Sequence, residues 1–230
     1  MPITGGELQA GDILFKHAPD KAVAKIILAK QRGIQKRLAR SAGIVGSAQA
    51  ARCTHVALAA DAHDVLEFDE GGSGIKLLGR GYGFVRGNMR AGARMGNTYD
   101  VFSCTNAHLG QAAADRAKFI WDLTHQSQRL KGSYGLGKLI RQLAKNPSKG
   151  KAYNTAALET RLEDWLTKKR SIKFICSEFA TFCYLWGAEE LGGVNLTNVF
   201  GIDRARLSPV ELYVRCETQG YFAFKGTLYA

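Results

Sequence analysis

The chain has 230 residues, of which 46% are hydrophobic and 23% charged, and this ordinary composition excludes a disordered or low-complexity protein. Its formal net charge of +12 predicts a surface that attracts polyanions such as anionic lipid, acidic wall polymers or nucleic acid. Charged residues interrupt every apolar run before it could span a bilayer, so we expect no integral membrane segment.

The order of the predicted elements indicates an α+β fold in which helices are segregated around short antiparallel strands. A run of glycines, GGSG (71–74), is expected to end one of these strands. Strands are predicted at 11–15, 53–60, 65–70 and 97–104, with 75–80 and 81–87 continuing the sheet and closing strands in 220–230. Helices are predicted at 19–40, 109–124, 134–145, 158–166 and 176–191, with a short helix or turn at 206–215.

The five cysteines form no CxxC pair, and their odd number and wide spacing argue against a disulfide framework or a zinc ribbon. Cys53 and His55 lie two residues apart on one predicted strand face and could share a metal ion. Nothing near them in the sequence completes a four-ligand site, so we expect neither a metal nor another cofactor. The cysteines are Cys53, Cys104, Cys176, Cys183 and Cys216.

Nucleotide and nucleic-acid binding have little support in the sequence. There is no GxxxxGK[ST] loop and no strand-linked GxGxxG. The stretch GRGYGFVRG (79–87) is glycine-rich and basic, but no partner strand of an RNA-binding sheet accompanies it. We therefore expect no nucleic-acid partner.

The stretch FICSEFATFCYLW (174–186) places Cys176 where a strand-like segment becomes a helix. A helix N-terminus stabilises a thiolate, because unpaired N–H groups point at the sulfur and the helix dipole favours negative charge. Cys183 lies two turns further along the same helix, on an aromatic face, and is predicted to be a core residue. Cys176 is thus the candidate nucleophile.

The candidate base is His55, which lies in the alternating strand THVALAA (54–60). Ala57 and Ala59 share its predicted face, and their small side chains leave room for another element to approach the imidazole. The remaining histidines are predicted to lie in turns, in loops or on helix surfaces: His17, His63, His108 and His125.

A catalytic imidazole also needs an acceptor that orients it, and the next strand, VLEFDE (65–70), offers two. One hairpin register faces His55 with Glu67, whereas another faces it with Asp69 and leaves Glu67 diagonal. A buried carboxylate between Leu66 and Phe68 needs a partner more than an aspartate near the strand end does, which favours Glu67.

Together these residues resemble the circularly permuted NlpC/P60 superfamily of papain-like proteins, which includes the YiiX/YebB-like and lecithin:retinol acyltransferase-like enzymes. The resemblance is carried by GDILF (11–15), THVALAA followed by VLEF, and FICSEF (174–179), in that order. It implies one domain over 1–230, with an antiparallel sheet or small barrel packed against helices and the nucleophile at a helix N-terminus. A basic helical segment at about 125–170 would be an insertion in this fold.

The resemblance also implies thiol hydrolysis of an amide or ester, with Cys176 as nucleophile, His55 as base and Glu67 as the residue that orients the imidazole. The basic charge and the lack of a signal-peptide pattern favour a peptidoglycan amidase or endopeptidase, made in the cytoplasm and exported as an antibacterial effector of the type VI secretion class. Its partners would be peptidoglycan and an immunity or carrier protein. Two alternatives stay open: a lipid acylhydrolase or acyltransferase of the same superfamily, and a non-catalytic basic module that binds anionic polymers.

Overall fold

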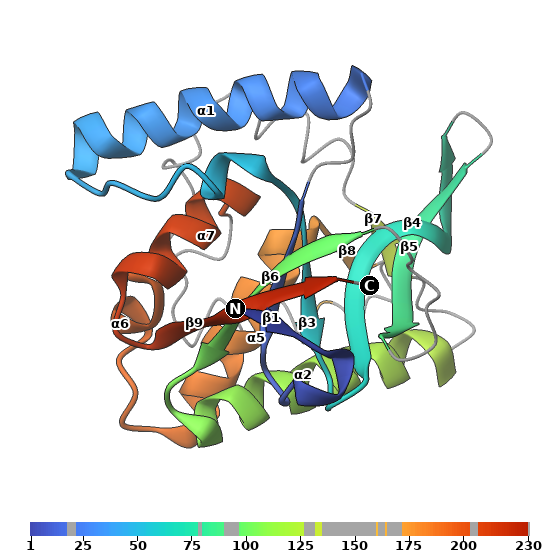
Figure 1. Cartoon of the computed structure of the whole chain (residues 1–230). Helices are drawn as coiled ribbons and strands as arrows, with labels where there is room; N and C mark the ends of the chain where they lie inside the picture. Colours follow the sequence, from blue (N-terminus) through green and yellow to red (C-terminus); the bar gives the residue numbers. More distant parts are fainter. Residues whose placement is uncertain are drawn as a thin grey trace.

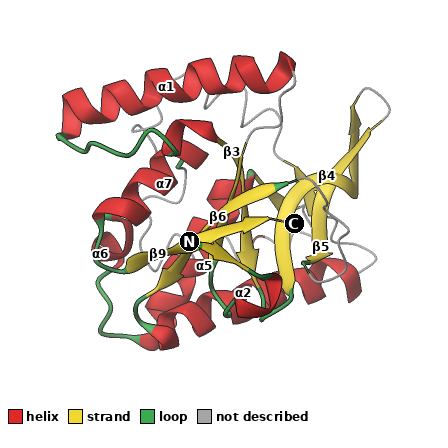
Figure 2. Cartoon of the chain, viewed as in Figure 1, coloured by secondary structure: helices red, strands yellow, loops and turns green. Residues whose placement is uncertain are grey.

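One curled sheet, with helices packed against it, organises the molecule (Figures 1 and 2). The computed structural model describes residues 1–17, 22–77, 80–89, 97–126, 132–134, 160, 164, 172–202 and 207–229. Within these residues the sheet has nine strands in the order β1-β9-β6-β2-β3-β4-β5-β7-β8. The strands are β1 (Pro2–Ile3), β2 (Ile13–His17), β3 (Cys53–Ala59), β4 (Asp64–Leu77), β5 (Arg80–Asn88), β6 (Thr98–Cys104), β7 (Gly132–Tyr134), β8 (Ile172–Phe174) and β9 (Phe222–Tyr229).

The pairing of the strands is mostly antiparallel, as the sequence predicts. Two pairs are parallel instead, β1 with β9 and β7 with β8. The α+β class and the sheet packed against helices are therefore confirmed. The helices are α1 (Ala22–Ala42), α2 (Ala107–Gln126), α5 (Cys176–Leu191), α6 (Leu196–Phe200) and α7 (Pro209–Thr218), with short 3-10 turns η1 (Gly5–Glu7) and η2 (Ala50–Arg52).

Helix α5 lies at the centre of the fold, and every residue from Cys176 to Ala188 is buried. It contacts strands β3 and β4 as well as helices α2, α6 and α7. A helix that is covered on all sides is mostly apolar all round, which explains the dense aromatic sequence that follows Cys176, although Ser177, Glu178 and Thr181 are also buried there. The helix ends at Gly192, whose φ of 62° is readily adopted by glycine.

The predicted strand at 65–70 proves too short, because the glycines at 71–74 do not end it. Strand β4 runs from Asp64 to Leu77, and its register against β5 shifts between Glu70 and Ile75. Glycine is tolerated at such an irregularity because it lets the backbone bend without a side-chain clash. Most of the predicted helices at 134–145 and 158–166, and with them most of the basic insertion, lie outside the described residues, although Tyr134 ends strand β7.

The sheet buries apolar side chains on both of its faces. On one face Phe15, Val56, Leu58 and Phe68 join the helices in a large apolar cluster. On the other face a smaller cluster forms, and α5 contributes nothing to it. Neighbouring residues along β2 and β3 alternate between the clusters, as the period of two along a strand requires. The smaller cluster comprises Ile3, Leu8, Leu14, Ala57, Ala59, Val65, Met89, Tyr99, Val101 and Leu228.

Candidate functional site

The imidazole of His55 and the carboxylate of Glu67 form a buried polar contact between β3 and β4. Nε2 of His55 lies 2.8 Å from Oε2 of Glu67. The residues are 7% and 0% exposed, respectively. A contact of this length in a water-poor environment fixes the position and the tautomer of the ring. The structure therefore brings together two of the three predicted site residues.

The register of β3 and β4 explains how Glu67 reaches the histidine. The paired residues are Leu58 with Leu66 and Ala59 with Val65. If the same register is extended along both strands toward the start of β3, Asp69 lies opposite His55 and Glu67 is the diagonal neighbour of His55. Diagonal neighbours on one face remain within reach of a long side chain, and the glutamate spans that gap. Sequence alone left these two registers open.

Cys176 is the first residue of α5 and is 1% exposed. The residue before it, Ile175, is the N-cap, and its apolar side chain cannot accept hydrogen bonds from the first helical turn. The first backbone bond of the helix runs from the N–H of Phe179 to the carbonyl of Ile175. The N–H groups ahead of Phe179 thus point out of the helix N-terminus, where they can stabilise negative charge.

Aromatic contacts anchor the start of α5 to β4. The ring centroid of Phe68, the residue after Glu67, lies 5.4 Å from that of Phe174 and 5.3 Å from that of Phe179. These two phenylalanines flank Cys176 in the chain, so the cysteine is held over the same part of β4. This packing sets the start of α5 against the strand that carries Glu67.

The thiol and the imidazole nevertheless approach β3 from different faces. Cys176 belongs to the large apolar cluster together with Val56. His55 follows the alternation of Ala57 and Ala59, which belong to the smaller cluster.

The other cysteines are poor candidates for a nucleophile. Burial raises the pKa of the Cys53, Cys183 and Cys216 thiols well above the ordinary value. Burial also raises the pKa of Cys104, which is the most exposed of these four. All four are therefore protonated near neutral pH. The prediction that Cys183 is a core residue is confirmed, since it is 0% exposed.

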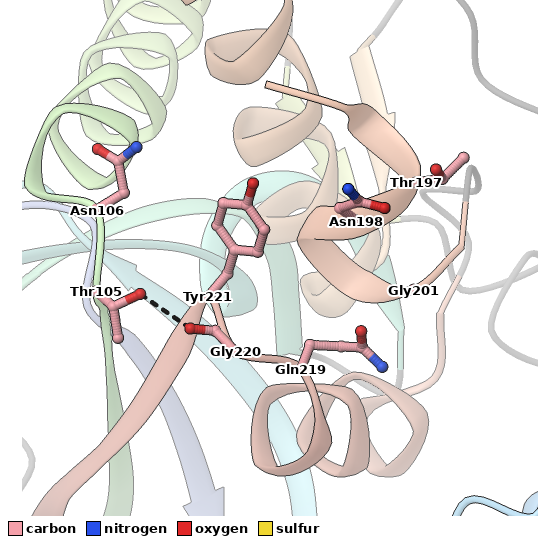
Figure 3. Close-up of a pocket in the computed structure, with 8 residues that line it drawn as sticks. All are labelled: Thr105, Asn106, Thr197, Asn198, Gly201, Gln219, Gly220 and Tyr221. Atoms are coloured by element: carbon pink, nitrogen blue, oxygen red, sulfur yellow. Dashed lines mark hydrogen bonds between the residues drawn. The ribbon is translucent and has the colours of Figure 1, made fainter. Parts of the chain in front are cut away.

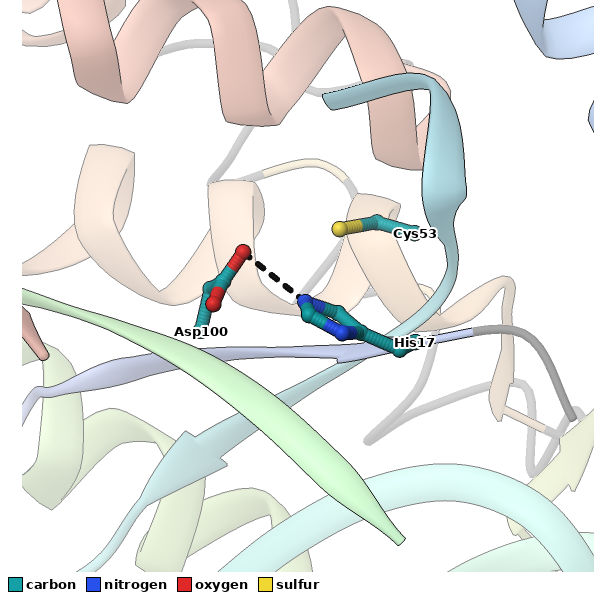
Figure 4. Close-up of side chains that lie close together, drawn as sticks. All are labelled: His17, Cys53 and Asp100. Carbon is teal, nitrogen blue, oxygen red and sulfur yellow. Dashed lines mark ion pairs between the residues drawn. The ribbon is translucent and has the colours of Figure 1, made fainter. Parts of the chain in front are cut away.

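A second cluster of potential ligands was not predicted from the sequence. His17, expected in a loop or on a helix surface, ends strand β2 and lies beside Cys53 and Asp100 (Figure 4). The expectation that Cys53 and His55 share one strand face is wrong, because the register shift pairs Cys53 with His17 and His55 with Lys16, and these two partners are adjacent in β2. No local signal could have revealed this cluster, since its members come from three different strands.

A polar pocket of about 540 Å³ lies elsewhere and contains none of the predicted site residues (Figure 3). It is formed by the segment that joins β6 to α2, by α6 and by the turn that leads into β9. Its lining is rich in amide and hydroxyl groups and carries no charged side chain. The lining residues are Thr105, Asn106, Thr197, Asn198, Gly201, Gln219, Gly220 and Tyr221.

Two further findings bear on function. In the part of the chain that the structure describes, no helix is both long enough and apolar enough to cross a membrane. Comparisons with protein-family models, with curated proteins and with solved structures gave no match. The functional interpretation therefore depends on the geometry of this chain's own residues.

Proposed function

We propose that the protein is a cysteine hydrolase that cleaves amide bonds, with Cys176 as nucleophile, His55 as general base and Glu67 as the residue that positions the imidazole. The observation that carries the proposal is the buried contact between His55 and Glu67. A carboxylate paired with an imidazole, together with a cysteine at a helix N-terminus, supplies the three groups that nucleophilic thiol catalysis needs. The permuted papain-like fold that the sequence resembles is part of this proposal.

The reaction follows from the roles of these groups. Because Glu67 contacts Nε2, Nδ1 is the nitrogen that would accept the proton of the Cys176 thiol. The thiolate attacks the substrate carbonyl, and the resulting oxyanion accepts hydrogen bonds from N–H groups at the start of α5. The imidazolium then gives its proton to the leaving amine, and water, activated by the same ring, hydrolyses the thioester.

Peptidoglycan peptides are the substrate class that we propose. The net charge of +12 favours binding to an anionic wall polymer, and the chemistry suits a peptide amide. A protein that cuts the cell wall of a competitor would also be exported with a carrier and neutralised by an immunity protein in the producing cell. These partners belong to the same proposal.

Digestion of purified peptidoglycan sacculi tests the substrate. The unaltered protein should release soluble fragments that carry new amino groups, whereas Cys176→Ala and His55→Gln should release none. Cys104→Ala serves as the matched control and should keep full activity, because this thiol lies outside the site. If the unaltered protein leaves sacculi intact but hydrolyses phospholipid vesicles, the lipid acylhydrolase alternative replaces the amidase.

Thiol labelling tests the catalytic role without a substrate. Cys104 is the more accessible thiol, since it is partly exposed while Cys176 is 1% exposed. If His55 activates Cys176, iodoacetamide at pH 6 should nevertheless modify Cys176 faster than Cys104. The preference should disappear in His55→Gln. Faster labelling of Cys104 in the unaltered protein would favour a non-catalytic binding module.

A further inference from the structure

Three side chains with different donor atoms converge at one end of β2 (Figure 4). They are the imidazole of His17, the thiol of Cys53 and the carboxylate of Asp100, and their ligand atoms all lie within 4.8 Å of one another. Nε2 of His17 is 2.8 Å from Oδ2 of Asp100. The cluster is largely closed to water: the side chains of His17 and Asp100 are 15% and 4% exposed and Cys53 is 0% exposed.

The register of the sheet creates this cluster. Strand β2 lies between β3 and β6, and Asp100 is paired with Phe15. The shift after Lys16 then pairs His17 with Cys53. A regular ladder would pair His17 with Thr54 instead and would turn the cysteine away from it. The irregularity therefore brings nitrogen, sulfur and oxygen donors from three strands together.

The carboxylate of the cluster is held in place by two further side chains. The hydroxyl of Tyr213 donates to Oδ2 of Asp100 at 2.9 Å, and the hydroxyl of Thr227 donates to Oδ1 at 3.0 Å. Such outer partners commonly orient the ligands of metal sites and are needed for their full affinity. Asp100 is thus positioned before any ligand arrives.

The histidine nitrogen of the cluster is buried without an adequate hydrogen bond. Nε2 of His17 has no hydrogen-bond partner among the described residues, although Oδ2 of Asp100 is close to it. A buried polar atom in this position carries a free-energy cost that a ligand could remove.

We propose that His17, Cys53 and Asp100 bind a divalent transition-metal ion of the zinc type. Imidazole, thiolate and carboxylate are the ligands of zinc, at about 2.0–2.3 Å each, and ligands around one such ion lie roughly 3–4 Å apart. Calcium and magnesium prefer oxygen ligands alone and do not suit this donor set. On binding, the Cys53 thiol releases its proton to solvent and the thiolate coordinates the ion. The ion would join β2, β3 and β6.

Cobalt(II) provides a direct test, because a cysteine thiolate bound to cobalt gives a charge-transfer absorption band in the near ultraviolet. In protein freed of metal with a chelator, the intensity of this band should increase until one equivalent of cobalt has been added. Zinc should then displace the cobalt, and the band should disappear. The band should be absent in Cys53→Ser. Cys104→Ser and Cys176→Ser are the matched controls, and both should keep it.

Two further variants keep the test decisive if Cys53→Ser fails to fold. His17→Gln should weaken cobalt binding at least about tenfold, and Thr227→Val, which removes only an outer partner, should weaken it about 10- to 100-fold. Zinc should raise the Tm of the unaltered protein and should raise that of His17→Gln much less. The proposal is overturned if the folded protein gives no band, or if the band or the affinity is unchanged in Cys53→Ser or His17→Gln.

Discussion

The contact between His55 and Glu67 makes a prediction that needs no substrate. Leucine is close in volume to both residues and can replace each of them with an apolar group. His55→Leu should cost about 3–5 kcal/mol of unfolding free energy, because a fully buried carboxylate loses this partner. Glu67→Leu should cost about 1–3 kcal/mol, the penalty for a buried polar group that loses its acceptor. In the double variant neither polar group remains, so its cost should fall below the sum of the two by about 1.5–3 kcal/mol.

Urea unfolding of the four proteins measures this coupling. With a slope of about 2 kcal/mol per molar urea, each kcal/mol shifts the midpoint by about 0.5 M, which is readily resolved. As a control, removal of the exposed Asp115–Lys118 pair by Asp115→Ala should change stability by less than about 0.5 kcal/mol. If the two leucine substitutions are additive to within about 0.5 kcal/mol, the side chains do not interact and the basis of the proposed triad is lost.

Three other predictions concern the scaffold and its pH dependence. Phe68→Ala should destabilise the fold by about 3–5 kcal/mol in thermal unfolding, because the ring is 0% exposed and packs against the start of α5. A loss of stability below about 1 kcal/mol would contradict this packing. Gly11→Ala should lower the unfolding free energy clearly more than Gly43→Ala. Both glycines have a positive φ, which costs alanine about 1–2 kcal/mol, but a Cβ at Gly11 would also lie 2.3 Å from the Gly110 carbonyl oxygen, whereas the space around Gly43 is open. Equal losses in the two variants would refute the clash. Burial alone would raise the pKa of Asp61, but two backbone N–H bonds in the β3–β4 turn outweigh it and hold this pKa below the ordinary 3.8. The ionised carboxylate therefore stabilises the fold above pH 3.8, and this stability is lost as the pH falls through the folded-state pKa. In urea unfolding, Asp61→Asn should be destabilising at pH 7 and progressively less so in acid. A difference in unfolding free energy that stays constant with pH would exclude this role of the Asp61 carboxylate.

Local sequence was sufficient to predict the central helix and the strands around the candidate site. The change from SIKFI to SEFATFCYLW marked the start of α5 at Cys176, and the glycines after Leu191 marked its end. The alternation in THVALAA marked β3 and assigned His55 and the two alanines to one face. These signals are local, because helix caps and strand periodicity depend on residues a few positions apart.

Register and strand neighbours, in contrast, were decided by the tertiary structure. The β3–β4 register brought Glu67 to His55 as a diagonal neighbour, and the shift between β2 and β3 gave Cys53 the partner His17 instead of His55. Strand β4 also continued through glycines that were expected to end it. A one-residue change of register reverses which side chains face each other, and it depends on contacts between residues far apart in the sequence. The sequence therefore determined which chemical groups the sheet carries, and only the packed sheet decided which of them meet.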